Sequence, residues 1–150
     1  MNVKCIDQGV TVDAIYGFEK HTMVELPLFL VAIPAGFPSP ADDYIDRKLD
    51  LNEFLVRHPA ATFFVRVTGD SMIDAGIHSG DILVVDRALE PDDNRVVIAA
   101  INGELTVKRI IKECGRLYLM PENIHFSPIE VTSEMQLDIW GVVTSVIHPL

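Results

Sequence analysis

Short runs of β-branched and aromatic residues dominate the chain after residue 60. They fall at residues 62–67, 82–85, 96–101, 105–111, 117–120 and 137–147. Gly, Pro, Asn and Asp separate the runs, as is typical of strands joined by turns. Asn102-Gly103 favours a type I′ turn, because both residues tolerate positive φ, and it should join the third and fourth runs into a hairpin. The pattern therefore predicts a mostly β, compact antiparallel domain with little helix.

The chain before residue 60 follows a different pattern. Residues 26–40 carry four prolines in 15 positions. Each proline removes a backbone donor and favours extended geometry, so this stretch is predicted to be an extended arm. Apolar positions in residues 42–56 approximate helical spacing, although Asp50 and Asn52 indicate a break or a new N-cap in the middle.

Composition restricts the classes of function. The 150 residues are 49% hydrophobic and 23% charged, which fits one folded domain with a real core. The formal net charge of -10 and the lack of a basic run disfavour direct nucleic-acid binding, including sequence-specific DNA binding. An acidic chain can still act in a nucleic-acid process by binding another protein.

The two cysteines, Cys5 and Cys114, show no zinc-finger spacing and indicate free thiols in a reducing compartment. We see no secretory signal, and the longest apolar stretch is about half of the ~20 residues that a membrane helix needs. The expected setting is therefore the cytoplasm, without a membrane.

Most familiar catalytic patterns are missing. There is no G-x-S-x-G elbow, S-x-x-K, H-E-x-x-H, P-loop or G-x-G-x-x-G motif, and the histidines are scattered. We therefore predict neither a metal site nor a cofactor. Asp70, Asp74 and Asp81 fit turn and capping roles better than an acid/base pair.

Two polar residues have alternative interpretations. Ser71 follows a predicted strand, where it is either a turn or N-cap serine, which local pattern favours, or a nucleophile near outward-pointing amides. Lys108 lies on the return strand of the predicted hairpin. Alternation places Glu104, Thr106 and Lys108 on one face, and periodicity alone favours a solvated lysine there.

Several motifs in order resolve these alternatives by resemblance. The segments Gly-Asp-Ser-Met at residues 69–72, Gly-Asp-Ile-Leu-Val-Val-Asp at 80–86 and Gly-Glu-Leu-Thr-Val-Lys at 103–108 resemble the self-cleaving serine-lysine peptidases. That family includes LexA-type repressors and the UmuD mutagenesis proteins. Residues 35–44 look like the cleavage region of UmuD, and the similarity spans about residues 26–146. The chain is identified as UmuD-like.

The resemblance implies a β peptidase fold of the LexA/UmuD C-terminal type, with Ser71 as nucleophile and Lys108 as general base. It also implies a scissile bond between Ala35 and Gly36. Residues 1–41 would form an N-terminal arm that contains the cleavage region, and residues 42–150 the peptidase-like domain.

The base needs an unusual environment. An ordinary lysine with a pKa near 10.4 is neutral less than ~0.1% of the time at pH 7. Lowering that pKa by about three units would disfavour the ammonium by roughly 4 kcal/mol. If residues 28–33 docked over the site as an added strand, they would exclude water from Lys108 and present a carbonyl to Ser71.

The resemblance further implies biological partners: a homodimer, a RecA–single-stranded DNA filament that assists cleavage, and a UmuC-like subunit of an error-prone DNA polymerase in the bacterial cytoplasm. Two alternatives stay open, a non-catalytic dimeric adaptor for a translesion polymerase and a leader-peptidase relative, although the latter would want a membrane anchor. A repressor role is disfavoured. Residues 10–16 are hypothesised to form a strand that covers the sheet or extends the dimer contact.

Overall fold

The computed structural model describes residues 9–18, 25–29 and 45–150. The chain divides into two compact units. One unit combines the chain up to Phe18 with His58–Leu150, and the other comprises Glu19–Arg57. The predicted cleavage bond between Ala35 and Gly36 lies outside the described residues.

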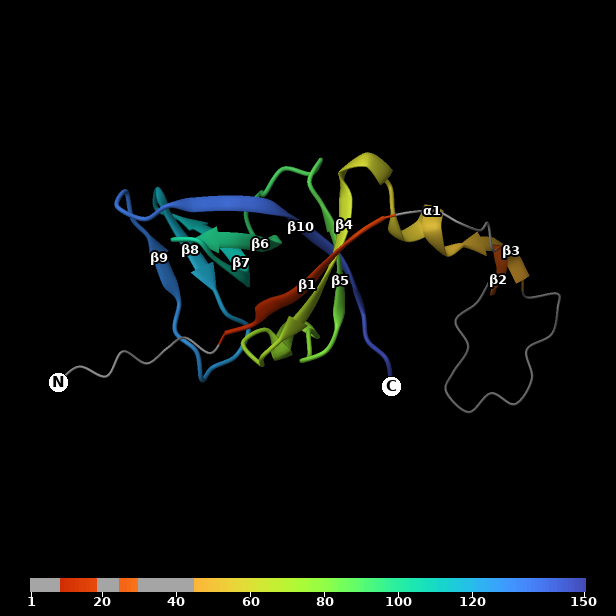
Figure 1. The fold of residues 1–150 in the computed structure, drawn as a ribbon, viewed down its shortest axis with the longest axis horizontal. Helices are drawn as coiled ribbons and strands as arrows, with labels where there is room; N and C mark the ends of the chain where they lie inside the picture. Colours follow the sequence, from red (N-terminus) through yellow and green to blue (C-terminus); the bar gives the residue numbers. More distant parts are fainter. Residues whose placement is uncertain (1–8, 19–24, 30–44) are drawn as a thin grey trace. The chain divides into compact units, whose positions relative to one another are not determined.

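The larger unit is an antiparallel β structure (Figure 1). Its strands are β1 (Thr11–Gly17), β4 (Thr62–Thr68), β5 (Ile82–Asp86), β6 (Val96–Ile101), β7 (Glu104–Glu113), β8 (Arg116–Met120), β9 (Ile129–Val131) and β10 (Leu137–Ile147). Short 3-10 turns at Pro59–Ala61 and Ile73–Ala75 accompany them. The strand order is β1-β4-β5-β10-β6-β7-β8-β9. The predicted mostly β antiparallel fold is confirmed.

β1 closes part of this sheet into a barrel-like ring. It pairs along β4 from Thr11 opposite Thr68 to Gly17 opposite Phe63. At its beginning it also pairs with β7, where Thr11 lies opposite Thr106. The hypothesised strand at residues 10–16 therefore exists, and it fills the space between β4 and β7.

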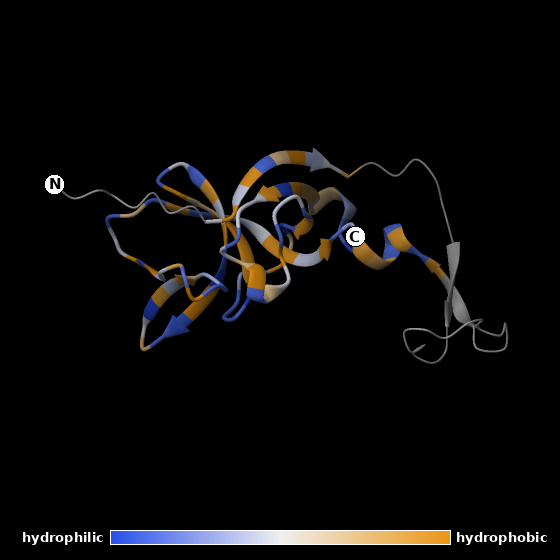
Figure 2. Ribbon diagram, turned by 90° about the horizontal axis from the view of Figure 1, so that it is seen from below, coloured by the Kyte–Doolittle hydropathy of each residue, from blue (hydrophilic) through white to orange (hydrophobic). Residues whose placement is uncertain are grey.

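The interior of the unit is built from alternating side chains. In β4, Val65 and Val67 are fully buried while Arg66 between them is exposed. Hydrophobic and hydrophilic segments alternate in the same way along the strand ribbons (Figure 2). Two buried clusters result, one within the ring around Val65 and Met72 and one around Val97 and Leu119. The burial of these side chains is the main source of stability.

The predicted hairpin is confirmed. Ile101 pairs with Glu104 across the turn. Asn102 and Gly103 have φ values of 50° and 85°, the left-handed conformations that a type I′ turn requires. This turn sets the register of β7 and so fixes the position of Lys108.

The smaller unit corrects one expectation. β2 (Glu25–Phe29) pairs with β3 (Ile45–Asp50), and within the described residues of this unit the helical segment is α1 (Leu51–Leu55). The helix expected from spacing is therefore wrong for residues 45–50, because pairing with β2 supplies a partner that a local pattern does not reveal. The predicted N-cap is confirmed, since the Asp50 carboxylate accepts a hydrogen bond from the Asn52 amide at 2.9 Å.

Candidate active site

Ser71 and Lys108 meet in the interior of the β unit. Ser71 follows β4 in a turn that begins at Gly69, whose φ of 107° suits glycine alone. Lys108 extends from the middle of β7. Both side chains are fully buried, and Lys108 Nζ lies 3.4 Å from Ser71 Oγ. The structure thus brings together the two residues that the motifs singled out.

The buried position of Lys108 corrects the expectation from periodicity of a solvated lysine. The prediction that Thr106 and Lys108 share one face of β7 was right, because Lys108 Nζ donates to Thr106 Oγ1 at 3.0 Å. The prediction was wrong about water, because Lys108 is fully buried beside Ser71. Val107, on the opposite face of β7, is fully buried as well.

This pair can perform acyl-transfer chemistry. A serine hydroxyl becomes a useful nucleophile when a neighbouring base accepts its proton. Burial favours the neutral form of an amine over the ammonium. The neutral amine is the form that can act as a base. A separation of 3.4 Å between Ser71 Oγ and Lys108 Nζ is within the range seen when no substrate is bound.

The backbone of Val10 is the third component of the site. Its N–H donates to Ser71 Oγ at 2.7 Å. Its carbonyl accepts hydrogen bonds from the Val107 amide at 3.2 Å and from Thr106 Oγ1 at 3.1 Å. A segment of the same chain therefore lies against Ser71 and against the strand that holds Lys108, which the sequence motifs did not reveal.

A second segment, residues 122–123 after β8, is hydrogen-bonded to the turn that holds Ser71. The Glu122 amide donates to the Ser71 carbonyl at 2.7 Å, and Asn123 Nδ2 donates to the Asp70 carbonyl at 2.9 Å. The Glu122 carboxylate in turn forms an ion pair with Arg109 of β7. Ser71 is thus positioned from β4, β7 and the loop after β8, and sequence spacing alone gave no sign of Glu122 or Asn123.

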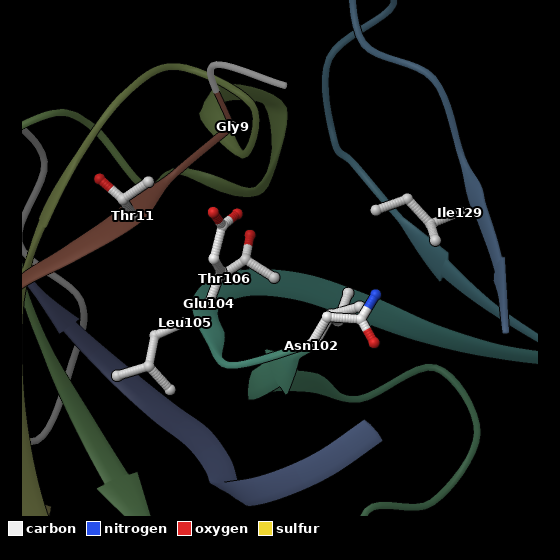
Figure 3. Close-up of a pocket in the computed structure, with 8 residues that line it drawn as sticks. Gly9, Thr11, Asn102, Glu104, Leu105, Thr106 and Ile129 are labelled. Carbon is white, nitrogen blue, oxygen red and sulfur yellow. The ribbon is translucent and has the colours of Figure 1, made fainter. Parts of the chain in front are cut away.

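A hollow of about 370 Å³ lies beside the start of β1. Its walls come from Gly9 and Thr11, from the Asn102–Thr106 part of the hairpin, and from Ile129 of β9 (Figure 3). Thr106 lines this hollow and also contacts Lys108 Nζ. Thr106 therefore links this hollow to the dyad.

The remaining candidates lie elsewhere. Asp81 caps a turn as expected, because its carboxylate accepts from the His78 amide at 2.7 Å, and His148 also lies beside it. Cys114 is free and exposed. The expected docking of residues 28–33 over the dyad stays a prediction. Residues 30–33 lie outside the described part of the chain, and residues 28–29 belong to the other unit. Among the described residues, no helix is long and apolar enough to cross a membrane.

Comparison with known proteins agrees with this geometry. Residues 27–144 match the Peptidase S24-like family. Protein SamA of Salmonella typhimurium is 52% identical over 122 residues, covering 81% of this chain and 84% of SamA. Protein MucA of Escherichia coli is 46% identical over 128 residues, covering 83% of this chain and 87% of MucA. A LexA repressor of Hahella chejuensis is 40% identical over 117 residues, covering 77% of this chain and 58% of the repressor. The chain therefore belongs to the Peptidase S24-like family, as a UmuD-like member of the LexA/UmuD group.

Proposed function

We propose that this protein is a serine endopeptidase that cleaves itself between Ala35 and Gly36 with a Ser71–Lys108 dyad. The observation that carries the proposal is the 3.4 Å separation between Lys108 Nζ and Ser71 Oγ, with both side chains fully buried. Membership of a peptidase family over residues 27–144 supports the same chemistry. No cofactor takes part in this scheme.

The reaction follows from the two side chains. Ser71 Oγ attacks the carbonyl carbon of Ala35 while Lys108 Nζ takes the hydroxyl proton. When the bond between Ala35 and Gly36 breaks, Lys108 returns that proton to the departing amine of Gly36. Water then hydrolyses the ester on Ser71, which releases the N-terminal fragment with a new carboxylate and restores the hydroxyl.

We place this reaction in the bacterial SOS response to DNA damage. In this scheme a RecA–single-stranded DNA filament assists cleavage in the cytoplasm, and the shortened chain, as a homodimer, joins a UmuC-like error-prone polymerase. Residues 1–41 are then the arm, of which residues 1–35 are released, and residues 42–150 are the peptidase-like domain that persists. The coverage of 81% of this chain by SamA at 52% identity supports assignment to this functional group.

The test uses the full chain at about pH 10, and separately near pH 7 with RecA, single-stranded DNA and a nucleotide. Intact mass spectrometry identifies the products beside Ser71→Ala and Lys108→Ala. We expect one cut after Ala35 that both substitutions abolish, and a faster reaction at pH 10 than at pH 7 without RecA, because the base must be neutral. An uncut wild-type chain under both conditions would contradict cleavage and favour the non-catalytic adaptor.

A further inference from the structure

Among the described residues, β1 is the element that separates β4 from β7. The turn that holds Ser71 leaves from the end of β4, and Lys108 lies on β7. β1 pairs with β4 along its length and with β7 at Thr11. Without β1, the ring would be open between these two strands, and the opening would expose the dyad to an incoming chain.

Gly9 and Val10 lie between β4 and β7 and make the kind of main-chain contacts that a bound peptide makes. Both polar groups of the Val10 backbone are used, the N–H by Ser71 Oγ and the carbonyl by Val107 and Thr106. Such main-chain bonds to a strand edge are how extended peptides are recognised by strand addition. The Val10 side chain is fully buried in the same cluster as Met72, next to Ser71.

The catalytic turn is shaped to this backbone. A Cβ on Gly69 would lie 2.7 Å from the Gly9 carbonyl oxygen and 3.2 Å from Val10 Cα. Any other residue at position 69 would therefore displace the segment. The fit requires both the missing side chain and the positive φ of Gly69.

The contact with Ser71 is not suited to cleavage of the Gly9–Val10 bond. A backbone N–H lies in the plane of its peptide group, so the 2.7 Å hydrogen bond places Ser71 Oγ in the direction of that N–H. Attack on a carbonyl carbon comes instead from the face of the peptide plane. The segment thus holds the nucleophile as a hydrogen-bond acceptor and leaves the peptide bond intact.

We propose that residues 9–17 compete with the cleavage region for one binding place. This place, called here the catalytic groove, is the space between β4 and β7 beside Ser71 and Lys108. The inference rests on the proposed function, because it assigns regulation to the same dyad. Residues 35 and 36 and Val10 cannot contact Ser71 Oγ together, so self-cleavage requires β1 to withdraw from the groove. The hollow beside Thr106 then joins the vacated groove and provides room for the incoming chain.

The first test weakens β1 by substitution in the full chain. Val10→Asp introduces a charge at a fully buried position just before β1, and Tyr16→Asp is the matched control on β1 itself, at a position that is 46% exposed. We expect self-cleavage at pH 10 to be at least tenfold faster in Val10→Asp and within twofold of wild type in Tyr16→Asp. An unchanged or slower rate in Val10→Asp would overturn the competitor role.

The second test holds β1 in place. Thr11 and Thr68 are paired residues on β1 and β4, so Thr11→Cys with Thr68→Cys can form a crosslink, with Cys5 and Cys114 replaced by Ser. We expect the oxidised chain to cleave at least tenfold more slowly than the reduced chain. Equal rates would overturn the inference even if Val10→Asp fails to fold. Absence of any Ser71-dependent cut in every variant would instead refute the proposed function.

An independent observation concerns the start of β5 and the end of β10. Asp81, which is 1% exposed, lies between two histidines. His148 Nδ1 is 2.5 Å from one carboxylate oxygen, and His78 Nδ1 is 3.8 Å from the other. The His78 Nδ1 atom is buried and has no hydrogen-bond partner in the described part of the chain. Three donor atoms therefore converge within 4.8 Å of one another.

These donors fit a divalent transition-metal ion. Two imidazoles and a carboxylate are common zinc ligands, with bond lengths of about 2.0–2.2 Å. Tetrahedral ligands at such lengths are separated by about 3.3 Å, so the 2.5 Å and 3.8 Å separations need only side-chain rotations. We infer a Zn²⁺ site formed by His78, Asp81 and His148 with water as a fourth ligand, which would tie the chain after β10 to the loop before β5.

The test measures binding without reference to cleavage. Apo protein at pH 7.5 receives Zn²⁺ in thermal unfolding and Co²⁺ in visible absorption. We expect a rise in Tm of several degrees and tetrahedral Co²⁺ bands, both lost in His78→Gln and in His148→Gln and retained in the His125→Gln control. A wild-type chain without Co²⁺ bands, or the same bands in His78→Gln, would refute the site.

Discussion

Replacing Val10 by alanine measures how firmly the segment of residues 9–17 is held. The side chain is fully buried among Val65, Val67 and Met72, so the substitution removes two methyl groups from a packed interior. Lost burial at about 0.8 kcal/mol per group, with a further cost for the cavity, gives a loss of about 2–3 kcal/mol in the free energy of unfolding. In a chain of this size that corresponds to a fall in Tm of about 4–12 °C.

The assay is urea unfolding followed by the fluorescence of Trp140, the single tryptophan, which packs against the same cluster. Intact mass confirms that the chain stays uncut during the measurement. Tyr16→Ala on the exposed part of β1 is the control, with an expected change below about 0.5 kcal/mol. If Val10→Ala costs no more than Tyr16→Ala, β1 does not form part of the folded core and the reasoning is refuted.

Three further substitutions, with Gly17→Ala as a control, test the packing and the dyad. Gly141→Ala would place a Cβ 2.7 Å from Val85 Cγ1 and should cost about 1–3 kcal/mol in urea unfolding, whereas Gly17→Ala, with nothing within 4 Å, should cost under about 1 kcal/mol. Gly69→Ala adds strain at positive φ to a clash with the β1 segment and should lower stability by more than about 2 kcal/mol, as read from the urea midpoint. Lys108→Met keeps the buried volume without the amine, so intact mass should show no self-cleavage while the urea midpoint stays equal or rises.

Local sequence was sufficient for the strands that end in clear turn signals. The hairpin at Asn102-Gly103 and the run that became β10 were predicted because their residue types and flanking turns agree. The three-residue strand β9, at Ile129–Val131, was missed because so short a run carries no periodicity. Residues 45–50 were misread as helical because their strand exists through pairing with β2, which is not a local property.

The candidate site required information beyond periodicity. Alternation predicted a solvated Lys108, because it shows which side chains share a face and not which face another strand covers. Family motifs paired Ser71 with Lys108 across 37 residues, and the structure places the two atoms 3.4 Å apart. Val10 is 61 residues from Ser71 and belongs to no recognised motif, so only the fold reveals their hydrogen bond.

The properties that a catalytic groove needs also make it open to occupation by its own chain. A groove that desolvates Lys108 and offers unpaired strand edges beside Ser71 will bind any extended segment with a small or β-branched residue at the right place. Residues 9–17 are joined to the same chain as residues 35 and 36, so under the proposed competition the two segments would compete at effective concentrations set by chain length rather than by affinity from solution. Each 1.4 kcal/mol that favours β1 lowers the open fraction tenfold. In the proposed competition, about 2 kcal/mol from the burial of Val10 would lower the open fraction about 30-fold, and a factor that captures the N-terminal segment would release that restraint without touching the dyad.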